Sequence, residues 1–201
     1  MKVLIIGGGA SGMMAALSAK KQGAEVCILE RQARVGRKLL ATGNGRCNLT
    51  NTKLTIHNYH GQNPSFAQPA LQTFDTKKAL AFFQSLGLLS TVEPSGRVYP
   101  LSDQAGSVVD VLRLAMEEMG IDVRTSFEVT ALKRGKKGGF QVSSKEEMLH
   151  ADAVIVCCGG MAGGKLGGTQ SGYDLLQSQG HTVTKLFPAL VQVKTDTSFV
   201  K

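Results

Sequence analysis

The stretch VLIIGGGASG, residues 3–12, places a short apolar run directly before a glycine-rich loop. The spacing is Gly-x-Gly-x-x-Gly, at Gly7, Gly9 and Gly12. In a dinucleotide-binding loop the first glycine permits a tight turn and the second lets the backbone approach a pyrophosphate. The third lets the following helix pack closely against the strand. The stretch therefore predicts a strand–loop–helix unit that binds a dinucleotide.

The residues that follow this loop predict the helix. Met13 to Leu17 are good helix formers and continue the chain without a break. The first N–H groups of such a helix, at Ala10 and Ser11, point toward a bound anion at the positive end of the helix dipole. We expect both residues to contact the cofactor. The alternative is a tight strand–helix connection that holds no ligand.

A second apolar run, Glu25 to Leu29, predicts the next parallel strand and leads into Glu30. A carboxylate about 20 residues after the glycine loop accepts hydrogen bonds from a ribose 2′-hydroxyl. It disfavours NADP, because a 2′-phosphate would meet a negative charge at this strand end. Arg31 weakens that preference and is itself a candidate for cofactor contact.

The stretch GRKLLATGNGRCNLTN, residues 36–51, favours FAD as the dinucleotide. It combines glycines, cations and small hydrogen-bonding residues, a composition suited to wrapping a long polar ligand. A solvated basic loop is the alternative interpretation. The candidate cofactor contacts in this stretch are Lys38, Gly43, Gly45, Arg46, Cys47 and Asn48.

Five segments resemble, in this order, the YhiN/BaiN-type flavoproteins, a bacterial family of FAD-dependent, NAD(P)/FAD-oxidoreductase-like proteins. The segments are GGGASG (7–12), GRKLLATGNGRCNLTN (36–51), SGRVYPLSDQAGSVVDVL (95–112), ADAVIVCCGG (151–160) and SGYDLLQSQGHTVTKLFPALVQV (171–193). The resemblance implies an α/β fold of the FAD-type Rossmann (GR2-like) kind, with a central parallel sheet and an antiparallel β-meander. It also implies extended FAD as the cofactor, with NADH or NADPH as the candidate electron donor.

The resemblance also bears on domain organisation, because members of that family are longer than this chain. It implies an FAD-binding domain over residues 1–190 and the start of a linker over residues 191–201. The family's inserted domain and C-terminal closing segment are then absent. We accordingly expect the N-terminal portion of a longer enzyme, or a fragment that binds FAD or ADP without turnover.

Further elements follow from residue patterning. An apolar strand that ends at Gly159 and Gly160 is expected in the middle of the sheet, because central parallel strands are apolar throughout. The resemblance places both glycines against the dinucleotide and makes Val129, in the first meander strand, a candidate backbone contact for adenine; an ordinary strand role for Val129 is equally open. The predicted ranges are helices 76–86, N-capped by Asp75, and 107–119, and strands 97–100, 121–124, 128–134, 140–144, 148–151 and 153–158.

No residue is assigned to catalysis, because flavin itself carries the redox step. Cys47 lies between Arg46 and Asn48 in a basic loop that would lower the pKa of its thiol. No second cysteine lies nearby as a dithiol partner, so a packing or flavin-edge role is the alternative. Arg46 and Lys38 are expected beside the flavin ring or the pyrophosphate. The four cysteines show no metal-ligand spacing, and we predict no metal.

The net charge of +8 is the one bulk property that suggests a macromolecular partner. Flavoproteins similar to this family include enzymes that modify RNA bases, so flavin-dependent, dihydrouridine-type modification of ribosomal RNA is an alternative function. Dispersed lysines and a phosphate-rich cofactor are the other explanation of the charge. No signal peptide or membrane-spanning run is evident, which predicts a cytoplasmic protein with no membrane partner. The main prediction remains an FAD-dependent oxidoreductase acting on a small molecule.

Overall fold

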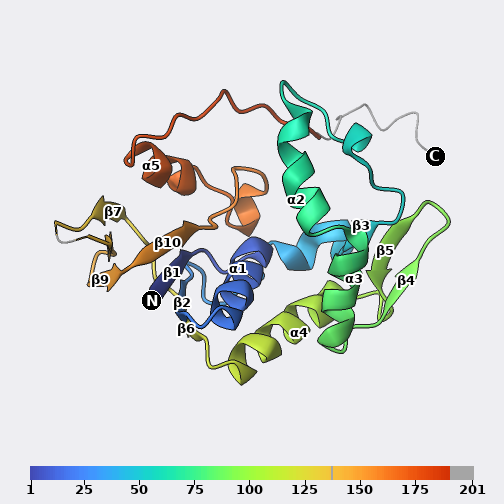
Figure 1. The fold of residues 1–201 in the computed structure, drawn as a ribbon, viewed down its shortest axis with the longest axis horizontal. Helices are drawn as coiled ribbons and strands as arrows, with labels where there is room; N and C mark the ends of the chain where they lie inside the picture. The colour runs from blue at the N-terminus through green and yellow to red at the C-terminus, as the bar shows by residue number, and fades with distance from the viewer. Residues whose placement is uncertain (137, 191–201) are drawn as a thin grey trace, which may run out of the picture.

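The computed structural model describes residues 1–136 and 138–190, and the expected linker at 191–201 lies outside them. Its centre is a four-stranded parallel sheet with the spatial order β10-β1-β2-β6 (Figure 1). The strands are β1 (Lys2–Ile6), β2 (Glu25–Leu29), β6 (Asp122–Arg124) and β10 (Ala153–Val156). The strand–loop–helix unit and the α/β class predicted from the sequence are both confirmed.

Successive residues of β1 enter two separate hydrophobic cores, because side chains alternate between the faces of a strand. Val3 and Ile5 pack on the face covered by the helices α1 (Ala10–Lys21) and α4 (Ala105–Glu118). Leu4 and Ile6 pack on the opposite face, against the meander and α5 (Ser171–Gln177). Cover on both faces explains why β1 is apolar from Val3 to Ile6.

The prediction that residues 153–158 form a buried central strand is wrong. β10 ends at Val156, and among the described residues β1 is the one strand that pairs with it. Ile155 is 37% exposed, as an edge strand allows. An apolar run indicates that both faces are covered, but it carries no information on how many neighbours a strand has along the sheet.

The antiparallel meander forms as predicted, but its first strand begins later. Its strands are β7 (Ala131–Arg134), β8 (Phe140–Ser143) and β9 (Met148–Ala151). Val129, expected inside the first strand, lies before it. The reason is that the backbone N–H of Phe127 donates to the carbonyl oxygen of Glu30 (2.9 Å), which ties this segment to the end of β2.

A second lobe lies on the side of α1 away from the meander (Figure 1). It holds an antiparallel sheet of order β3-β5-β4, of which only β5 was predicted. Its strands and helices are β3 (Thr50–Asn51), β4 (Ser90–Val92), β5 (Arg97–Pro100), α2 (Gln68–Thr73) and α3 (Thr76–Ser85). Asp75 caps α3 as predicted, its carboxylate accepting from the backbone N–H of Lys78 (2.8 Å).

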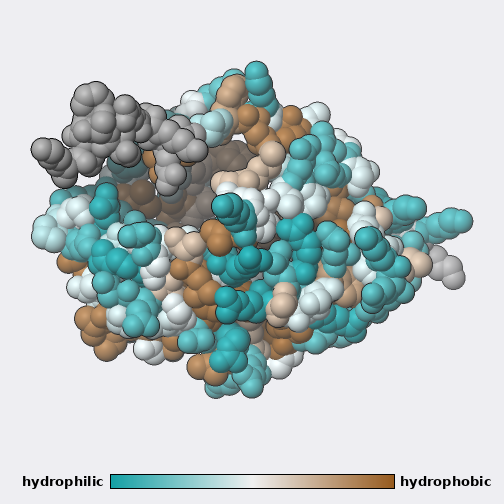
Figure 2. Space-filling view, turned by 180° about the vertical axis from the view of Figure 1, so that it is seen from behind, coloured by the Kyte–Doolittle hydropathy of each residue, from teal (hydrophilic) through white to brown (hydrophobic). Residues whose placement is uncertain are grey.

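Short 3₁₀ segments complete the described chain: η1 (Leu39–Gly45), which is interrupted by non-helical backbone at Thr42, Gly43 and Asn44, η2 (Ile56–Asn58), η3 (Pro64–Ala67) and η4 (Gly164–Leu166). Seen from behind, the surface is largely hydrophilic and is hollowed near its top, with hydrophobic residues at the floor of the hollow (Figure 2). In the described part of the chain, every helix is too short or too polar to cross a lipid bilayer.

Candidate cofactor-binding site

A cavity of about 480 Å³ lies at the carboxyl ends of β1 and β2. Its walls come from the glycine loop, the segment after β2, the helices α3 and α4, and the residues that follow β10. This is where open parallel sheets bind ligands, and the volume suits a small molecule or part of a cofactor. The sequence-predicted residues that line it are Gly7, Gly9, Ala10, Ser11, Glu30, Lys38, Cys47, Asn48 and Gly159.

The three glycines of the loop face different surroundings. A Cβ atom on Gly7 would lie 2.5 Å from the carbonyl oxygen of Cys157, and one on Gly12 would overlap the carbonyl oxygen of Gly7. A Cβ atom on Gly9 would meet nothing within 4 Å. Gly7 and Gly12 therefore fix the packing of loop, strand and helix, whereas Gly9 leaves open space beside the loop.

The N-terminus of α1 presents unpaired donors to this cavity. The N-cap is Gly9, which has no side chain that could accept from the first N–H groups of the helix. No acidic residue stands in the first turn. The first backbone bond of the helix runs from Met13 N–H to the carbonyl oxygen of Gly9 (2.9 Å). The N–H groups of Ala10 and Ser11 have no acceptor within the helix, so they can bind an anion.

Glu30 is held in place by backbone donors at the end of β2. One carboxylate oxygen accepts from Gly8 N–H (2.6 Å) and the other from Gln32 N–H (2.7 Å). Each oxygen keeps a further lone pair, because a carboxylate can accept about four hydrogen bonds. Glu30 thus joins the glycine loop to the segment after β2, and its contact with a ribose stays a prediction.

A smaller hollow of about 60 Å³ adjoins the cavity and shares Glu30 and Cys158 with it. Arg31 and Val129, the two other predicted contacts at this end, line the hollow. Arg31 donates from its guanidinium to the carbonyl oxygen of Gly167 (3.0 Å). Both residues lie outside the main cavity, and their contact with a cofactor stays a prediction.

Sequence reasoning missed part of the cationic wall. Arg34 and Arg37 line the cavity beside Lys38, whose ammonium group donates to the carbonyl oxygen of Gly160 (3.3 Å). Arg37 donates to the carbonyl oxygen of Lys165 (3.1 Å). The signal was present in the sequence, because four cations fall between Arg31 and Lys38. Glu30 is the acidic residue on the cavity wall, so the wall carries an excess of positive charge.

The apolar part of the wall was also missed. Phe83 comes from α3, whereas Val108 and Leu112 come from α4, so these side chains meet only after the chain has folded. Their apolar spacing in the sequence indicates a helix face that packs against the core and gives no sign of a cavity. The remaining apolar residues that line it are Met14, Leu39, Leu49 and Leu166.

Arg46 does not line the cavity, so the cavity wall gives no support to its predicted place beside the flavin or the pyrophosphate. Its guanidinium pairs with the carboxylates of Asp103 and Glu93, the latter at 3.0 Å, and stacks 3.9 Å from the ring centroid of Tyr99. The physical reason is that two carboxylates and an aromatic face outside the cavity together bind this cation and hold it there. The predicted contacts Gly12, Gly43, Gly45 and Gly160 also lie off the cavity lining.

Cys47 lines the cavity, but its thiol is not activated. Burial raises the pKa of Cys47, so the hypothesis of a lowered pKa in a basic loop is wrong. The adjacent cation, Arg46, is paired elsewhere. Burial also raises the pKa of Cys157 and takes that of Cys158 to about 11. The thiols near the cavity are therefore neutral at pH 7.

Asn48 has a structural role besides lining the cavity. With its amide nitrogen turned toward the neighbouring carbonyl groups, it donates to Thr50 (2.8 Å) and Val98 (3.3 Å). This ties the loop to β3 and β5. Within residues 1–136 and 138–190, no three His, Cys, Asp or Glu side chains form a group that could hold a metal ion.

Comparison with known proteins agrees with this geometry. A family model described as the HI0933-like protein Rossmann domain matches residues 1–196. The 3-dehydro-bile acid delta(4,6)-reductase of Clostridium scindens is 45% identical over 195 residues, 96% of this chain and 47% of the relative. The ribosomal RNA dihydrouridine synthase of Escherichia coli is 28% identical over 188 residues, 94% of this chain and 46% of the relative. The chain thus spans about half the length of these relatives.

Among solved structures, THI4 of Thermovibrio ammonificans is similar to this chain with a TM-score of 0.56 and 16% sequence identity. The match covers 89% of this chain and 62% of that protein. At this identity the likeness concerns the fold alone. It supports the arrangement of sheet, helices and glycine loop described above.

Proposed function

Because the chain belongs to the HI0933-like family of Rossmann-domain proteins, we propose that it binds FAD as the cofactor-binding part of an oxidoreductase. One observation carries the proposal. A single cavity joins the open N-terminus of α1, the fixed carboxylate of Glu30 and a wall that is partly cationic and partly apolar. These surfaces suit the pyrophosphate, the ribose and the flavin of one dinucleotide.

The residues present fit such a cofactor. The open space beside Gly9 leaves room for a pyrophosphate against the free N–H groups of Ala10 and Ser11. The charges of Arg34 and Lys38 add attraction for an anion that is partly shielded from water. Glu30 favours a ribose with a free 2′-hydroxyl.

When bound, flavin supplies the hydride transfer, and the chain's own residues bind and orient it. The apolar side chains of Phe83, Val108 and Leu112 keep water from one side of the cavity. The neutral thiols of Cys47 and Cys157 add no negative charge there. The positive charge of the wall favours a negatively charged ligand over a neutral one.

For the complete reaction we propose reduction of a small organic molecule, with NADH or NADPH as electron donor and the cytoplasm as its location. The bile acid reductase, 45% identical over nearly the whole chain, supports this reaction class. Reduction of a ribosomal RNA base is a second candidate. It rests on the net charge of +8 and on the dihydrouridine synthase of Escherichia coli, 28% identical.

The test of FAD binding is titration of the full chain by calorimetry, together with the visible spectrum of the bound flavin. Gly9→Val is the variant that tests the loop, because a Cβ atom at this position meets no protein atom within 4 Å and the side chain would extend into the open space beside the loop. We expect saturable FAD binding by the wild type and at least tenfold weaker binding by the variant. Equal binding by both proteins would refute the assignment of the loop.

Electron transfer is tested separately by adding NADH or NADPH to the FAD complex without oxygen. Bleaching of the yellow colour by either donor supports the oxidoreductase proposal. A yellow complex that neither donor bleaches favours the alternative of a cofactor-binding unit without turnover. Binding of a ribosomal RNA fragment that weakens steeply with salt would support the RNA candidate.

A further inference from the structure

Arg46 connects three parts of the second lobe to the loop that walls the cavity. Its guanidinium pairs with Glu93, just after β4, and with Asp103, between β5 and α4. The same group lies 3.9 Å from the ring centroid of Tyr99 on β5. A planar guanidinium can bond two carboxylates and stack on a ring at once, which an ammonium group cannot do equally well. We call these three partners with Arg46 the clamp.

The loop that carries Arg46 has an unusual backbone. Gly43, Asn44, Gly45 and Cys47 all have positive φ, at 55°, 59°, 86° and 59°. Asparagine adopts this left-handed region fairly readily, but the side chain of Cys47 disfavours it, so the conformation at Cys47 costs free energy unless neighbouring contacts hold it. Two backbone bonds hold the loop from within. Arg46 N–H donates to Gly43 (3.2 Å) and Cys47 N–H to Thr42 (3.0 Å).

The strained loop is also part of the cavity. Thr42, Cys47 and Asn48 line it, whereas the side chain of Arg46 points to the clamp. The positive charge of Arg46 is matched there by two carboxylates, so it is not free to attract an anionic ligand. Thr42, Cys47 and Asn48 do not line the small hollow of Arg31 and Val129, so under the proposed function this wall would face the part of a dinucleotide beyond the pyrophosphate.

We propose that Arg46 is a positioning residue, whose clamp holds the loop Thr42–Asn48 in the left-handed conformation that shapes the cavity wall. It acts on the ligand through this wall and does not touch it. The identity of that ligand as FAD rests on the proposed function. The conformation of the loop does not, and it can be tested in the ligand-free protein.

The first test measures the rate at which iodoacetamide alkylates Cys47, followed by peptide mass mapping. Cys47 is 6% exposed, so its reaction reports opening of the loop. We expect Arg46→Gln to raise this rate about tenfold, as loss of about 1.4 kcal/mol of loop stability would do. Alkylation of Cys157, which follows β10 and lies outside the loop that carries Arg46, should keep its rate. An unchanged rate for Cys47 overturns the proposal.

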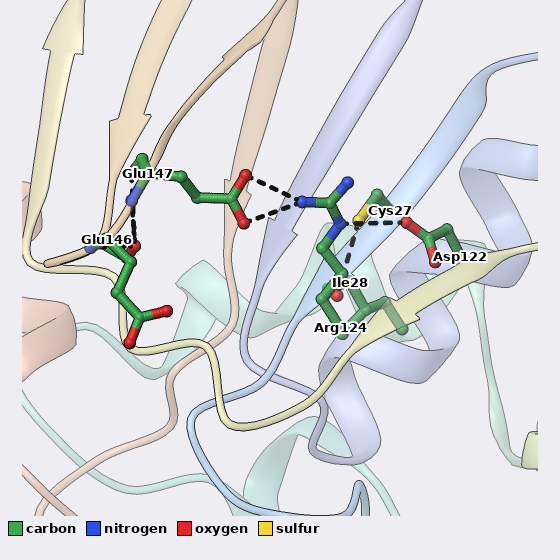
Figure 3. A network of polar contacts seen from close by, with 7 residues as sticks. Cys27, Ile28, Asp122, Arg124, Glu146 and Glu147 are labelled. Carbon is green, nitrogen blue, oxygen red and sulfur yellow. Dashed lines mark hydrogen bonds and ion pairs between the residues drawn. The ribbon is translucent and has the colours of Figure 1, made fainter.

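Arg124→Gln is the matched control for this experiment. Arg124 also bridges two carboxylates, those of Glu147 (3.1 Å) and Asp122 (3.4 Å), as Figure 3 shows. None of these three residues lines the cavity. Arg124→Gln should therefore leave the alkylation of Cys47 unchanged, whereas an increase equal to that of Arg46→Gln would overturn a specific role for the clamp.

The second test compares FAD and ADP binding by calorimetry in Arg46→Gln, Glu93→Gln and Asp103→Asn. If the clamp holds the loop, all three variants should bind FAD more weakly, and Arg46→Gln about tenfold more weakly. Their affinity for ADP should stay within about twofold of wild type. Arg46→Lys should recover part of the loss. If Arg46 touched the ligand directly, removal of its carboxylate partners would leave FAD binding unchanged or tighter, and that pattern overturns the proposal.

The two proposals fail in distinguishable ways. A wild-type chain that does not bind FAD refutes the proposed function, while the alkylation of Cys47 still decides the role of the clamp. Normal FAD binding with unchanged alkylation in Arg46→Gln refutes the clamp alone. The visible circular dichroism of bound flavin adds a readout, because a displaced wall changes the surroundings of the ring without unfolding the chain.

Discussion

Gly9 and Gly12 belong to one loop, yet a side chain would have opposite consequences at the two positions. Gly9 has φ −78°, which any residue can adopt, and faces open space. Gly12 sits against the carbonyl oxygen of Gly7, with no room for a Cβ atom. One glycine therefore serves the ligand and the other serves the packing of helix on strand.

This contrast predicts two different phenotypes. Gly9→Val should keep the free energy of unfolding close to wild type and lose FAD binding. Gly12→Ala should lower the free energy of unfolding by about 1–3 kcal/mol, because the loop must move away from the helix. Urea unfolding and calorimetry on both variants provide the measurement. Similar losses of stability in the two variants would contradict this division.

Glu30 has a double role at the residue scale, since its carboxylate binds the protein backbone and faces the cavity. Glu30→Ala should weaken FAD binding by about 1–3 kcal/mol, the usual cost of losing hydrogen bonds to a charged group. Glu30→Gln, which keeps an oxygen acceptor, should lose less. Calorimetry measures both, and an unchanged dissociation constant in Glu30→Ala would mean that the ribose is held elsewhere.

At the scale of elements, the short helix α3 links a local sequence signal to the cavity wall. It begins after Asp75, whose carboxylate accepts from the backbone N–H of Lys78. It carries Phe83 into the cavity, and Phe82 and Phe83 pack edge to face with ring centroids 5.4 Å apart. The stability of α3 therefore affects how firmly Phe83 is held on the apolar side of the cavity.

Removal of the cap tests that connection. Asp75→Ala should lower the free energy of unfolding by about 1 kcal/mol, because a backbone donor at the helix start loses its partner. Asp75→Ser keeps a capping oxygen and should lose much less. Urea unfolding of the two variants measures the difference, and an equal loss in both would show that Asp75 acts by something other than capping.

At the scale of the whole molecule, the sheet separates two cores, and Cys27 lies in the core on the meander side. Burial and the neighbouring Asp122 raise the pKa of Cys27 to about 12. Figure 3 shows its sulfur beside Asp122 and Arg124. Burial raises the pKa of Cys158, in the same region, to about 11. Both thiols are ordinary titrating groups in the unfolded chain.

The pH dependence follows from these shifts. A folded-state pKa above the unfolded value of about 9 means that the native chain binds more protons between these values. The stabilisation is complete below pH 9 and is lost as the pH rises through the folded-state pKa values, about 11 for Cys158 and about 12 for Cys27. Urea unfolding at several pH values should show that the free energy of unfolding decreases as the pH rises. Cys27→Ala should show a smaller decrease. The same decrease in the variant would contradict the role of Cys27.

The sequence by itself determined the parts of this protein whose cause is local. The glycine spacing from Gly7 to Gly12, the strand that ends at Glu30 and the cap at Asp75 each depend on neighbouring residues. The structure has the turn, the strand end and the cap where these residues predicted them. The position of Glu30 on the cavity wall also follows, because parallel strands end at the same edge of a sheet.

The tertiary structure alone decided the features that depend on residues far apart in the chain. The neighbours of Arg46 decided that its charge faces Glu93 and Asp103, 47 and 57 positions away, instead of the cavity. Burial decided that Cys47 is a neutral thiol. Strand order decided that β10 lies at the edge of the sheet formed by the described residues. Charge pairing, desolvation and sheet order are set by three-dimensional surroundings, which residue type and spacing do not specify.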